Sequence, residues 1–253
     1  MDDELVERIY EAAVLPELWG GVLDRLNDVG EGFATFLFTA TPEENRWLGS
    51  QRGGYASDYI AEGWPGRTDR ALRLIAARHA GFLGDLDVYT PDEMDREPVF
   101  TEFLRPRGIG WGAATAIMVP NGDTLIFDVE RRIETGPVNR ETIAKLDALR
   151  PHLARAGLLS ARLAFERARA GVMALEHVGL PAAILSKGTR VLAANPRFSA
   201  MIPLSSSTGL GRVALTDRTA DALLAAALER LVQQGTPVAS RRCRSRLATS
   251  ILR

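Results

Sequence analysis

The chain has 253 residues, of which 46% are hydrophobic and 25% charged, and its formal net charge is -1. This composition is typical of a globular protein of one or two domains, and the sequence has no run of about 18 apolar residues, the length that a membrane span requires. A single cysteine, Cys243, excludes an internal disulfide, and the acidic start Met-Asp-Asp-Glu-Leu is unlike a signal peptide. We therefore expect a reduced, cytoplasmic protein without a membrane partner.

Positive charge is concentrated in residues 239–253, which contain five arginines and no acidic residue. The rest of the chain therefore carries a net charge of about -6, which argues against nucleic-acid binding by that part, because affinity for phosphate comes mostly from cationic side chains. We expect 239–253 to be a disordered tail whose binding to DNA is at most weak and without sequence preference.

The first half of the chain has the pattern of an α+β domain. Apolar residues at helical spacing predict helices within 3–28, and two β-rich runs at 32–40 and 46–51 predict paired strands. Two more helices are expected over 55–64 and 68–79.

A hairpin and a long helix follow. Strands expected at 111–119 and 124–131 flank Asn121-Gly122, a dipeptide typical of tight hairpin turns. Residues 137–177 are helical in pattern, and Pro151 is expected to kink or divide this segment because proline removes a backbone hydrogen bond. Its apolar stripe is too long for one small domain to cover, so we predict a parallel homodimer. The candidate interface residues are Leu149, Leu153, Leu159 and Leu163.

The last part of the chain predicts a small α+β domain. Apolar runs at 182–185 and 191–194 flank a Ser-Lys-Gly-Thr turn, and Asn195-Pro196 begins a helix. A strand over 212–216 and a helix over 217–233 follow, and no further amphipathic pattern completes the domain.

Motifs of catalysis and cofactor binding are absent from the sequence. There is no P-loop, no HExxH and no paired CxxC, and the three histidines are far apart. The acidic residues of 85–95 are typical of a solvated loop, and the glycines of 108–113 of a tight turn into a strand. We expect no catalytic residue, no metal and no cofactor.

Aromatic residues gather in the middle of the first unit. We expect most of them to be core and a minority to surround a cavity of roughly several hundred Å³, because small-molecule pockets are largely apolar. The candidate ligand-binding residues are these aromatic side chains and one acid: Tyr55, Tyr59, Trp64, Phe103, Trp111 and Asp69. Tyr59, Asp69, Phe103 and Trp111 are expected to converge on this cavity.

Two stretches resemble known families. The run LPAAILSKGTRVLAANPRFSAMI resembles the start of a PAS domain, with Asn195, Pro196 and Phe198 matching its pattern over about residues 172–234. The stretch from YASDYIAEGW to TLIFDVER resembles the GAF-like, autoinducer-binding sensor of LuxR-type transcriptional regulators, and this resemblance covers roughly residues 3–135.

The second resemblance implies roles for single residues. Tyr55 and Tyr59 lie where that family has its tyrosine and tryptophan, and Asp69 matches the aspartate that holds a ligand amide. Gly108 or Gly112 would be the family glycine. Gly84 stands at about the place of a lactone-contacting tryptophan, which argues against an acyl-homoserine-lactone ligand.

We therefore predict an α+β protein in four segments: a GAF-like α/β/α sensor domain (1–136), a connecting and dimerisation helix (137–177), an incomplete PAS-like domain (178–238) and a basic tail (239–253). A domain boundary is expected near 165–178. The predicted function is a small-molecule-sensing or dimerising regulatory module of a LuxR-type regulator, with an unidentified ligand and no enzymatic activity.

A LuxR-type regulator ends in a helix-turn-helix, and none is recognisable here, so we expect a chain truncated before that domain and DNA contact only through it. Two alternatives remain open. One is a purely structural dimerisation protein. The other is an enzyme of unrecognised type that uses the aromatic residues with Asp69, Asp85, Arg105 and Arg107.

Overall fold

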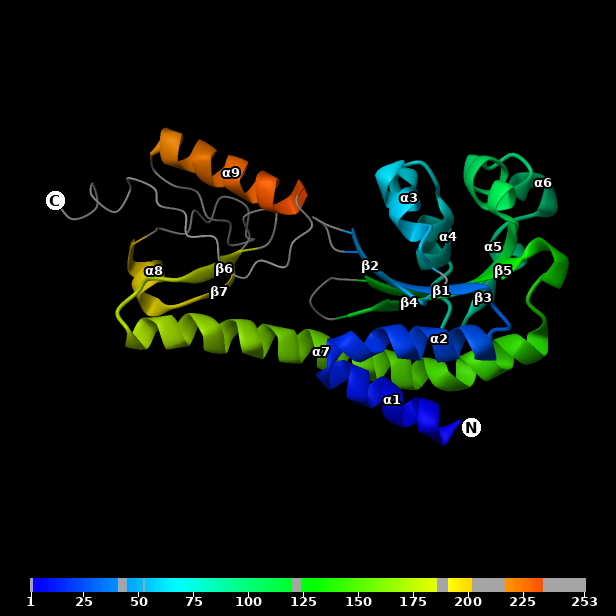
Figure 1. Ribbon diagram of the computed structural model, residues 1–253, viewed down its shortest axis with the longest axis horizontal. Helices are drawn as coiled ribbons and strands as arrows, with labels where there is room; N and C mark the ends of the chain where they lie inside the picture. The colour runs from blue at the N-terminus through cyan, green and yellow to red at the C-terminus, as the bar shows by residue number, and fades with distance from the viewer. Residues whose placement is uncertain are drawn as a thin grey trace. The chain divides into compact units, whose positions relative to one another are not determined.

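The computed structural model describes residues 2–40, 45–51, 53–119, 124–185, 191–201 and 217–233 (Figure 1). The chain divides into two compact units, Met1–Leu163 and Ala164–Arg253. Several expected features lie outside the described residues: the two hairpin turns, the strand at 212–216 and the tail 239–253 with Cys243.

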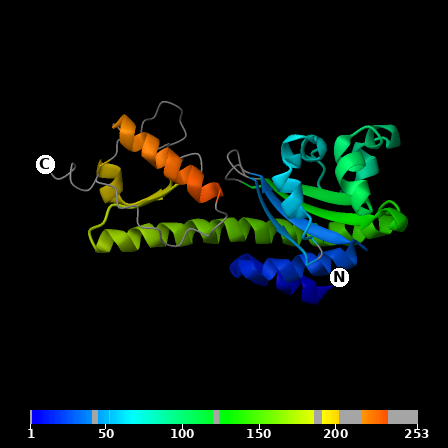
Figure 2. The ribbon, with the colours of Figure 1, turned by 45° about the horizontal axis from the view of Figure 1, so that its top comes forward.

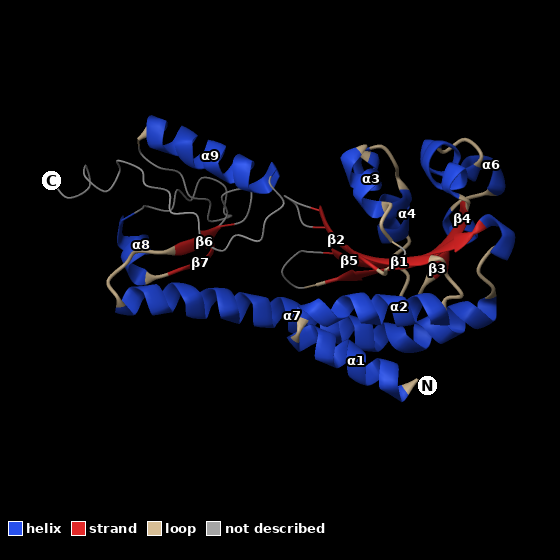
Figure 3. Ribbon diagram, viewed as in Figure 1, coloured by secondary structure: helices blue, strands red, loops and turns tan. Residues whose placement is uncertain are grey.

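The first unit is built on a five-stranded antiparallel sheet with helices on both faces, which confirms the expected α+β class (Figure 3). In order across the sheet, the strands are β2 (Asn45–Gly49), β1 (Ala34–Ala40), β5 (Thr124–Arg132), β4 (Ile109–Met118) and β3 (Leu83–Gly84). The predicted pair of hairpin strands is confirmed, since β4 and β5 pair from Met118↔Thr124 to Ile109↔Arg132.

One face of the sheet is covered by α1 (Asp3–Val14), α2 (Trp19–Val29) and the first part of α7 (Arg140–His177), as Figure 1 and Figure 2 show. Helix α1 begins at Asp2, whose side chain accepts a hydrogen bond from the Leu5 backbone N–H over 3.1 Å. Apolar residues at helical spacing on α1 and α2 are buried against the sheet, and they include Leu5, Ile9, Val22, Leu23 and Leu26.

The opposite face carries the short helices α3 (Ala56–Ala61), α4 (Arg70–Ala76), α5 (Asp85–Val88) and α6 (Pro91–Met94), seen above the sheet in Figure 3. A π-helical turn at Val99–Leu104 and a 3-10 turn at Arg105–Arg107 follow. The second turn stops at Gly108, whose φ of +73° is a conformation that favours glycine, and β4 begins directly after it. Further 3-10 turns are Pro16–Leu18, Trp64–Gly66 and Ile133–Thr135.

Strand β5 is the middle strand of the sheet, and its side chains contribute to the packing on both faces. Phe127 and Val129 belong to the core shared with α1, α2 and α7. Because side chains alternate along a strand, Asp128 and Glu130 point to the other face, where the short helices lie. Two charged side chains are thus placed in the interior of the first unit.

Helix α7 is continuous through Pro151, so the predicted division of this segment is wrong. Leu149 and Leu153, on either side of the proline, are 3% and 0% exposed and pack into the same core under the sheet. Burial of these side chains offsets the backbone hydrogen bond that proline removes, a loss of about 3 kcal/mol.

The second unit contains the antiparallel pair β6 (Ala183–Leu185) and β7 (Val191–Ala194), then α8 (Pro196–Met201) and α9 (Arg218–Gln233). The predicted strands at 182–185 and 191–194 and both predicted helices are therefore present. Asn195, which is fully buried, connects these elements through its side chain. Its Nδ2 donates to the Leu180 and Val172 carbonyls, and its Oδ1 accepts from the backbone N–H groups of Ala182 and Phe198.

Candidate ligand-binding site

A cavity of about 30 Å³ lies between the sheet and the short helices that cover one of its faces. Aromatic side chains form much of its wall: Phe36 and Phe38 come from β1, Tyr55 is the residue before α3, and Tyr59 lies within α3. Ring centroids of Phe36 and Tyr55 are 5.2 Å apart, and those of Phe38 and Tyr59 are 6.3 Å apart. The other wall is charged and consists of Arg70, Asp128 and Glu130.

Arg70 is the centre of a buried ion-pair cluster. Its Nη1 donates to Glu130 Oε1 over 2.8 Å, and its Nη2 donates to Asp85 Oδ1 over 3.1 Å. Asp128 Oδ2 lies 3.8 Å from Nη1. No more than 14% of any of these four side chains is exposed. One cation therefore faces three buried carboxyl groups, and the cluster has a negative net charge when all of them are ionised.

Four polar atoms of this region lack a hydrogen-bond partner among the described residues. They are Asp85 Oδ2, Asp128 Oδ1, Glu130 Oε2 and the hydroxyl oxygen of Tyr55. Leaving one buried polar atom without a partner costs about 1–3 kcal/mol, so native proteins keep few of them. Three of the four belong to residues that line the cavity.

Burial raises the pKa of each carboxyl group in the cluster, and the Arg70 cation opposes this effect only in part. The pKa of Glu130 rises to about 8 and that of Asp128 to about 6, with repulsion between the carboxylates adding to burial. Burial also raises the pKa of Asp85. Burial, Glu130 and Asp128 together raise the pKa of the Tyr55 hydroxyl well above its usual range. At neutral pH, Glu130 and Tyr55 therefore hold their protons.

Gly112 of β4 provides the space that the cluster occupies. It pairs with Glu130 of β5, and a Cβ atom added to it would lie 2.8 Å from Arg70 Nη2 and 3.3 Å from Glu130 Oε2. Any larger residue at this position would displace the guanidinium or the carboxyl group. The glycine-rich run 108–113 thus serves the buried cluster at Gly112 as well as the predicted turn at Gly108.

Of the predicted ligand-binding residues, Tyr55 and Tyr59 line the cavity, and Phe103 and Trp64 lie behind them. Phe103 is fully buried, and its ring centroid is 6.3 Å from Tyr55, 5.4 Å from Tyr59 and 5.6 Å from Trp64. These two residues form an aromatic layer that supports the cavity wall.

Asp69 and Trp111 do not line the cavity. The Asp69 side chain is 41% exposed and accepts hydrogen bonds from the Tyr89 hydroxyl and from Arg73 Nε. Trp111 Nε1 donates to the Ile133 carbonyl over 3.4 Å. The expectation that these residues converge on a cavity of several hundred Å³ is wrong, because the cavity of about 30 Å³ is lined by the neighbouring Arg70 and not by Asp69 or Trp111.

The predicted dimer-interface residues separate into two groups. Leu149 and Leu153 are buried under the sheet, so the prediction that they contact a second copy is wrong. Leu159 is 38% exposed and Leu163 is half-buried, so these two remain candidates.

The sequence interpretation does not include Arg70, Asp128 or Glu130, and it places Asp85 in a solvated loop. Asp85 is instead 8% exposed, because α5 folds back onto the sheet and Arg70 binds its carboxylate. One signal was available: TLIFDVER places two acidic residues at alternate positions and hence on one face of a strand. That pattern is also typical of a strand with one solvated face, so only the tertiary structure distinguishes the two cases.

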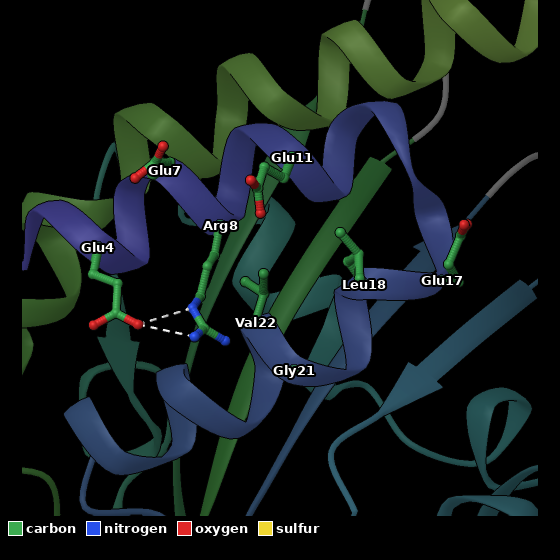
Figure 4. A pocket seen from close by; sticks show the side chains of 8 residues that line it. All are labelled: Glu4, Glu7, Arg8, Glu11, Glu17, Leu18, Gly21 and Val22. Carbon is green, nitrogen blue, oxygen red and sulfur yellow. Dashed lines mark hydrogen bonds and ion pairs between the residues drawn. The ribbon is translucent and has the colours of Figure 1, made fainter.

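A larger groove of about 530 Å³ lies between α1 and α2 (Figure 4). Glutamates dominate its lining, and Arg8 in the groove pairs with Glu4 over 2.9 Å. The side chains of this pair are 50% and 66% exposed, so water already solvates their charges. We therefore assign the candidate site to the small buried cavity.

Within the described ranges, no three acidic, histidine or cysteine side chains are placed to hold a metal ion. In the same part of the chain, no helix has the length and apolar character needed to cross a membrane.

No protein-family model and no curated protein matches the chain. Among solved structures, the VqsR LBD domain from Pseudomonas aeruginosa is 15% identical with a TM-score of 0.49, and the match covers 63% of this chain and 96% of that one. CepR2 from Burkholderia cenocepacia, an N-acylhomoserine-lactone-dependent LuxR-family transcription factor, is 16% identical with a TM-score of 0.48, with 65% and 99% covered. GAF3 of Slr1393 from Synechocystis is 13% identical with a TM-score of 0.39, with 63% and 97% covered. The structural neighbours of the chain include LuxR-family ligand-binding domains and GAF domains.

Proposed function

We propose that the first unit is a sensor that binds a small molecule and acts as the regulatory module of a transcriptional regulator. The observation that carries this proposal is the buried cavity with its unpartnered polar atoms. Small-molecule sites combine a largely apolar wall with a few polar groups that fix the ligand, and the aromatic side chains and the Arg70 cluster provide both.

Strand β5 offers a route by which binding would reach helix α7. Asp128 and Glu130 face the cavity, and Phe127 and Val129, which alternate with them along the strand, pack in the core that contains Leu146 and Leu153 of α7. A ligand that satisfies the carboxyl groups would stabilise β5 and hence the surface on which α7 packs. A ligand that binds only the folded protein, at a hundred times its Kd, stabilises it by about 2.7 kcal/mol.

A pair of alanine substitutions on α3 tests the proposal. Ala56 lines the cavity and is 1% exposed, whereas Ala61 is exposed at the end of the same helix. Ala56→Val adds two methyl groups to the cavity wall, and Ala61→Val makes the same change in solvent. Some compounds should raise the Tm of the unmodified protein or be retained by it in native mass spectrometry. We expect Ala56→Val to abolish this Tm increase and this retention, and Ala61→Val to leave both unchanged.

The proposal fails if no compound raises the Tm of the unmodified protein and none is retained on purification. It also fails if every stabilising compound acts equally on Ala56→Val and Ala61→Val.

A further inference from the structure

We propose that this cavity binds the ammonium group of a small organic amine, so that the sensor recognises a cation. This inference rests on the proposed function, since it names the chemical class of the ligand. It follows from the hydrogen-bonding capacity, the charge and the aromatic wall of the cavity, each of which favours the same group.

The unpartnered atoms along the cavity match the donors of an ammonium group. Three of its lining residues each carry one such oxygen: the Tyr55 hydroxyl, Asp128 Oδ1 and Glu130 Oε2. Glu130 is only 3% exposed and Asp128 9%, so water from the surface does not solvate them freely. An ammonium group has three N–H donors and no acceptor. One such group therefore has enough donors for these oxygens, with the Tyr55 hydroxyl and the neutral Glu130 carboxyl group accepting through their lone pairs while each keeps its own proton.

The charge of the cluster favours a cation. With Glu130 protonated at neutral pH, the positive charge of Arg70 still faces the two aspartates Asp85 and Asp128, so the cluster keeps one negative charge when both are ionised. The two Nη atoms of Arg70 already donate to Glu130 and Asp85. An anion would be repelled and would find few free donors. A neutral ligand would leave the negative charge uncompensated, which is unfavourable in a buried site.

The aromatic wall favours an organic cation over a metal ion. Phe36, Phe38, Tyr55 and Tyr59 present rings to the cavity, and aromatic faces attract ammonium groups. Magnesium and calcium instead require about six or more oxygen ligands, which rings do not supply.

The size of the cavity limits the part of the ligand that enters it. Its volume of about 30 Å³ holds a group as large as one water molecule, which is the size of an ammonium group. Phe38 and Tyr59 are half-buried, so the wall that they form extends toward solvent. We expect the carbon skeleton of the amine to pack between these two rings, which favours a short or flat skeleton.

Isothermal titration calorimetry of the full chain with matched probes tests the inference. The probes are 2-phenylethylammonium and methylammonium as cations, 2-phenylethanol as the neutral counterpart and 3-phenylpropanoate as the anion. The proteins are the unmodified chain, the Asp128→Asn/Glu130→Gln double variant and the Glu134→Gln control, in which the changed glutamate is exposed. Tryptophan fluorescence confirms that each protein is folded.

We expect an ammonium probe to bind the unmodified protein at least tenfold more tightly than the alcohol. Affinity should fall about a hundredfold in the double variant and stay unchanged in Glu134→Gln. Equal or tighter binding of the alcohol or the carboxylate would overturn the inference and leave the proposed function standing. Undiminished ammonium binding in the folded double variant would place the cation elsewhere and likewise overturn it. If no probe binds, the inference is overturned, and the Ala56→Val comparison decides separately whether the site binds small molecules.

Discussion

Replacing Glu130 by glutamine is expected to remove a loss of stability that the unmodified protein undergoes as pH rises. In the folded protein, burial holds the pKa of Glu130 at about 8, whereas the ordinary value is 4.5. Between these two pH values the unfolded chain has released this proton and the folded protein retains it. The free energy of unfolding therefore decreases as pH rises, by about 1.4 kcal/mol for each pH unit.

The magnitude follows from the width of that interval. Over the 3.5 pH units between 4.5 and 8, the decrease due to Glu130 alone is on the order of 5 kcal/mol. Glutamine cannot ionise, keeps an oxygen for Arg70 and offers an amide N–H near the other carboxyl groups. The variant should therefore equal the unmodified protein at about pH 4.5 and exceed its stability by several kcal/mol above about pH 8.

Chemical denaturation followed by tryptophan fluorescence measures this difference in the free energy of unfolding for the first unit of the chain. All four tryptophans of the chain, Trp19, Trp47, Trp64 and Trp111, belong to the first unit. Unfolding curves at a series of pH values give the free energy for the unmodified protein, for Glu130→Gln and for the exposed control Glu134→Gln. Parallel pH profiles for Glu130→Gln and the unmodified protein would refute the reasoning, because the buried carboxyl group would then not be the source of the loss.

Four further substitutions have definite expected results. Arg70→Met should destabilise the first unit by about 3–5 kcal/mol near pH 8 and by less near pH 5, because it leaves buried carboxylates unpaired until they take up protons; an equal loss at both pH values in urea unfolding would contradict this. Asn195→Ala should speed hydrogen exchange at the Ala182 and Phe198 amides and cost about 2–4 kcal/mol in the second unit, since four hydrogen bonds are lost; unchanged exchange would show that the side chain is dispensable. Leu153→Asp should unfold the first unit, whereas Leu159→Asp should leave it folded and reduce the mass found by light scattering at tens of micromolar, a range in which weak dimers form. An unmodified protein that is already monomeric there would reject the proposed dimer, and Ala164→Asp, another exposed position of α7, is the matched control.

The sequence predicted those elements whose patterns are local. The hairpin of β4 and β5 follows from the Asn-Gly turn and the β-rich runs beside it, and α7 follows from its apolar spacing. Strand β3 has only two residues and no periodicity, so it exists only because Leu83 and Gly84 pair with Ala114 and Ala113. The division of the helix at Pro151, one of its two predicted effects, is wrong, and tertiary burial on both sides of the proline explains why the helix continues.

The candidate site was predictable in part. Tyr55 and Tyr59 were predicted from their aromatic character and the family resemblance, and both line the cavity. Asp69 was predicted from the family resemblance alone, and the sequence does not show that the adjacent Arg70, at the start of α4, is the residue that faces the sheet. The burial of Asp128 and Glu130 depends on the short helices that cover them, and no pattern within the strand encodes that cover.

The Glu130→Gln substitution is expected to have opposite effects on stability and on amine binding, and this connects the stability of the cluster with its function. A cluster selected only to hold the fold would balance its charges, or would be replaced by apolar side chains, since removing a buried ion pair is often neutral or stabilising. Here the imbalance lies on β5, which pairs with both β1 and β4, so its cost falls on the centre of the sheet. Glu130→Gln should therefore stabilise the protein above about pH 8 and at the same time weaken amine binding. A Glu130→Gln variant that gains stability and keeps full affinity for the amine would show that the negative charge of Glu130 serves neither the fold nor ligand binding.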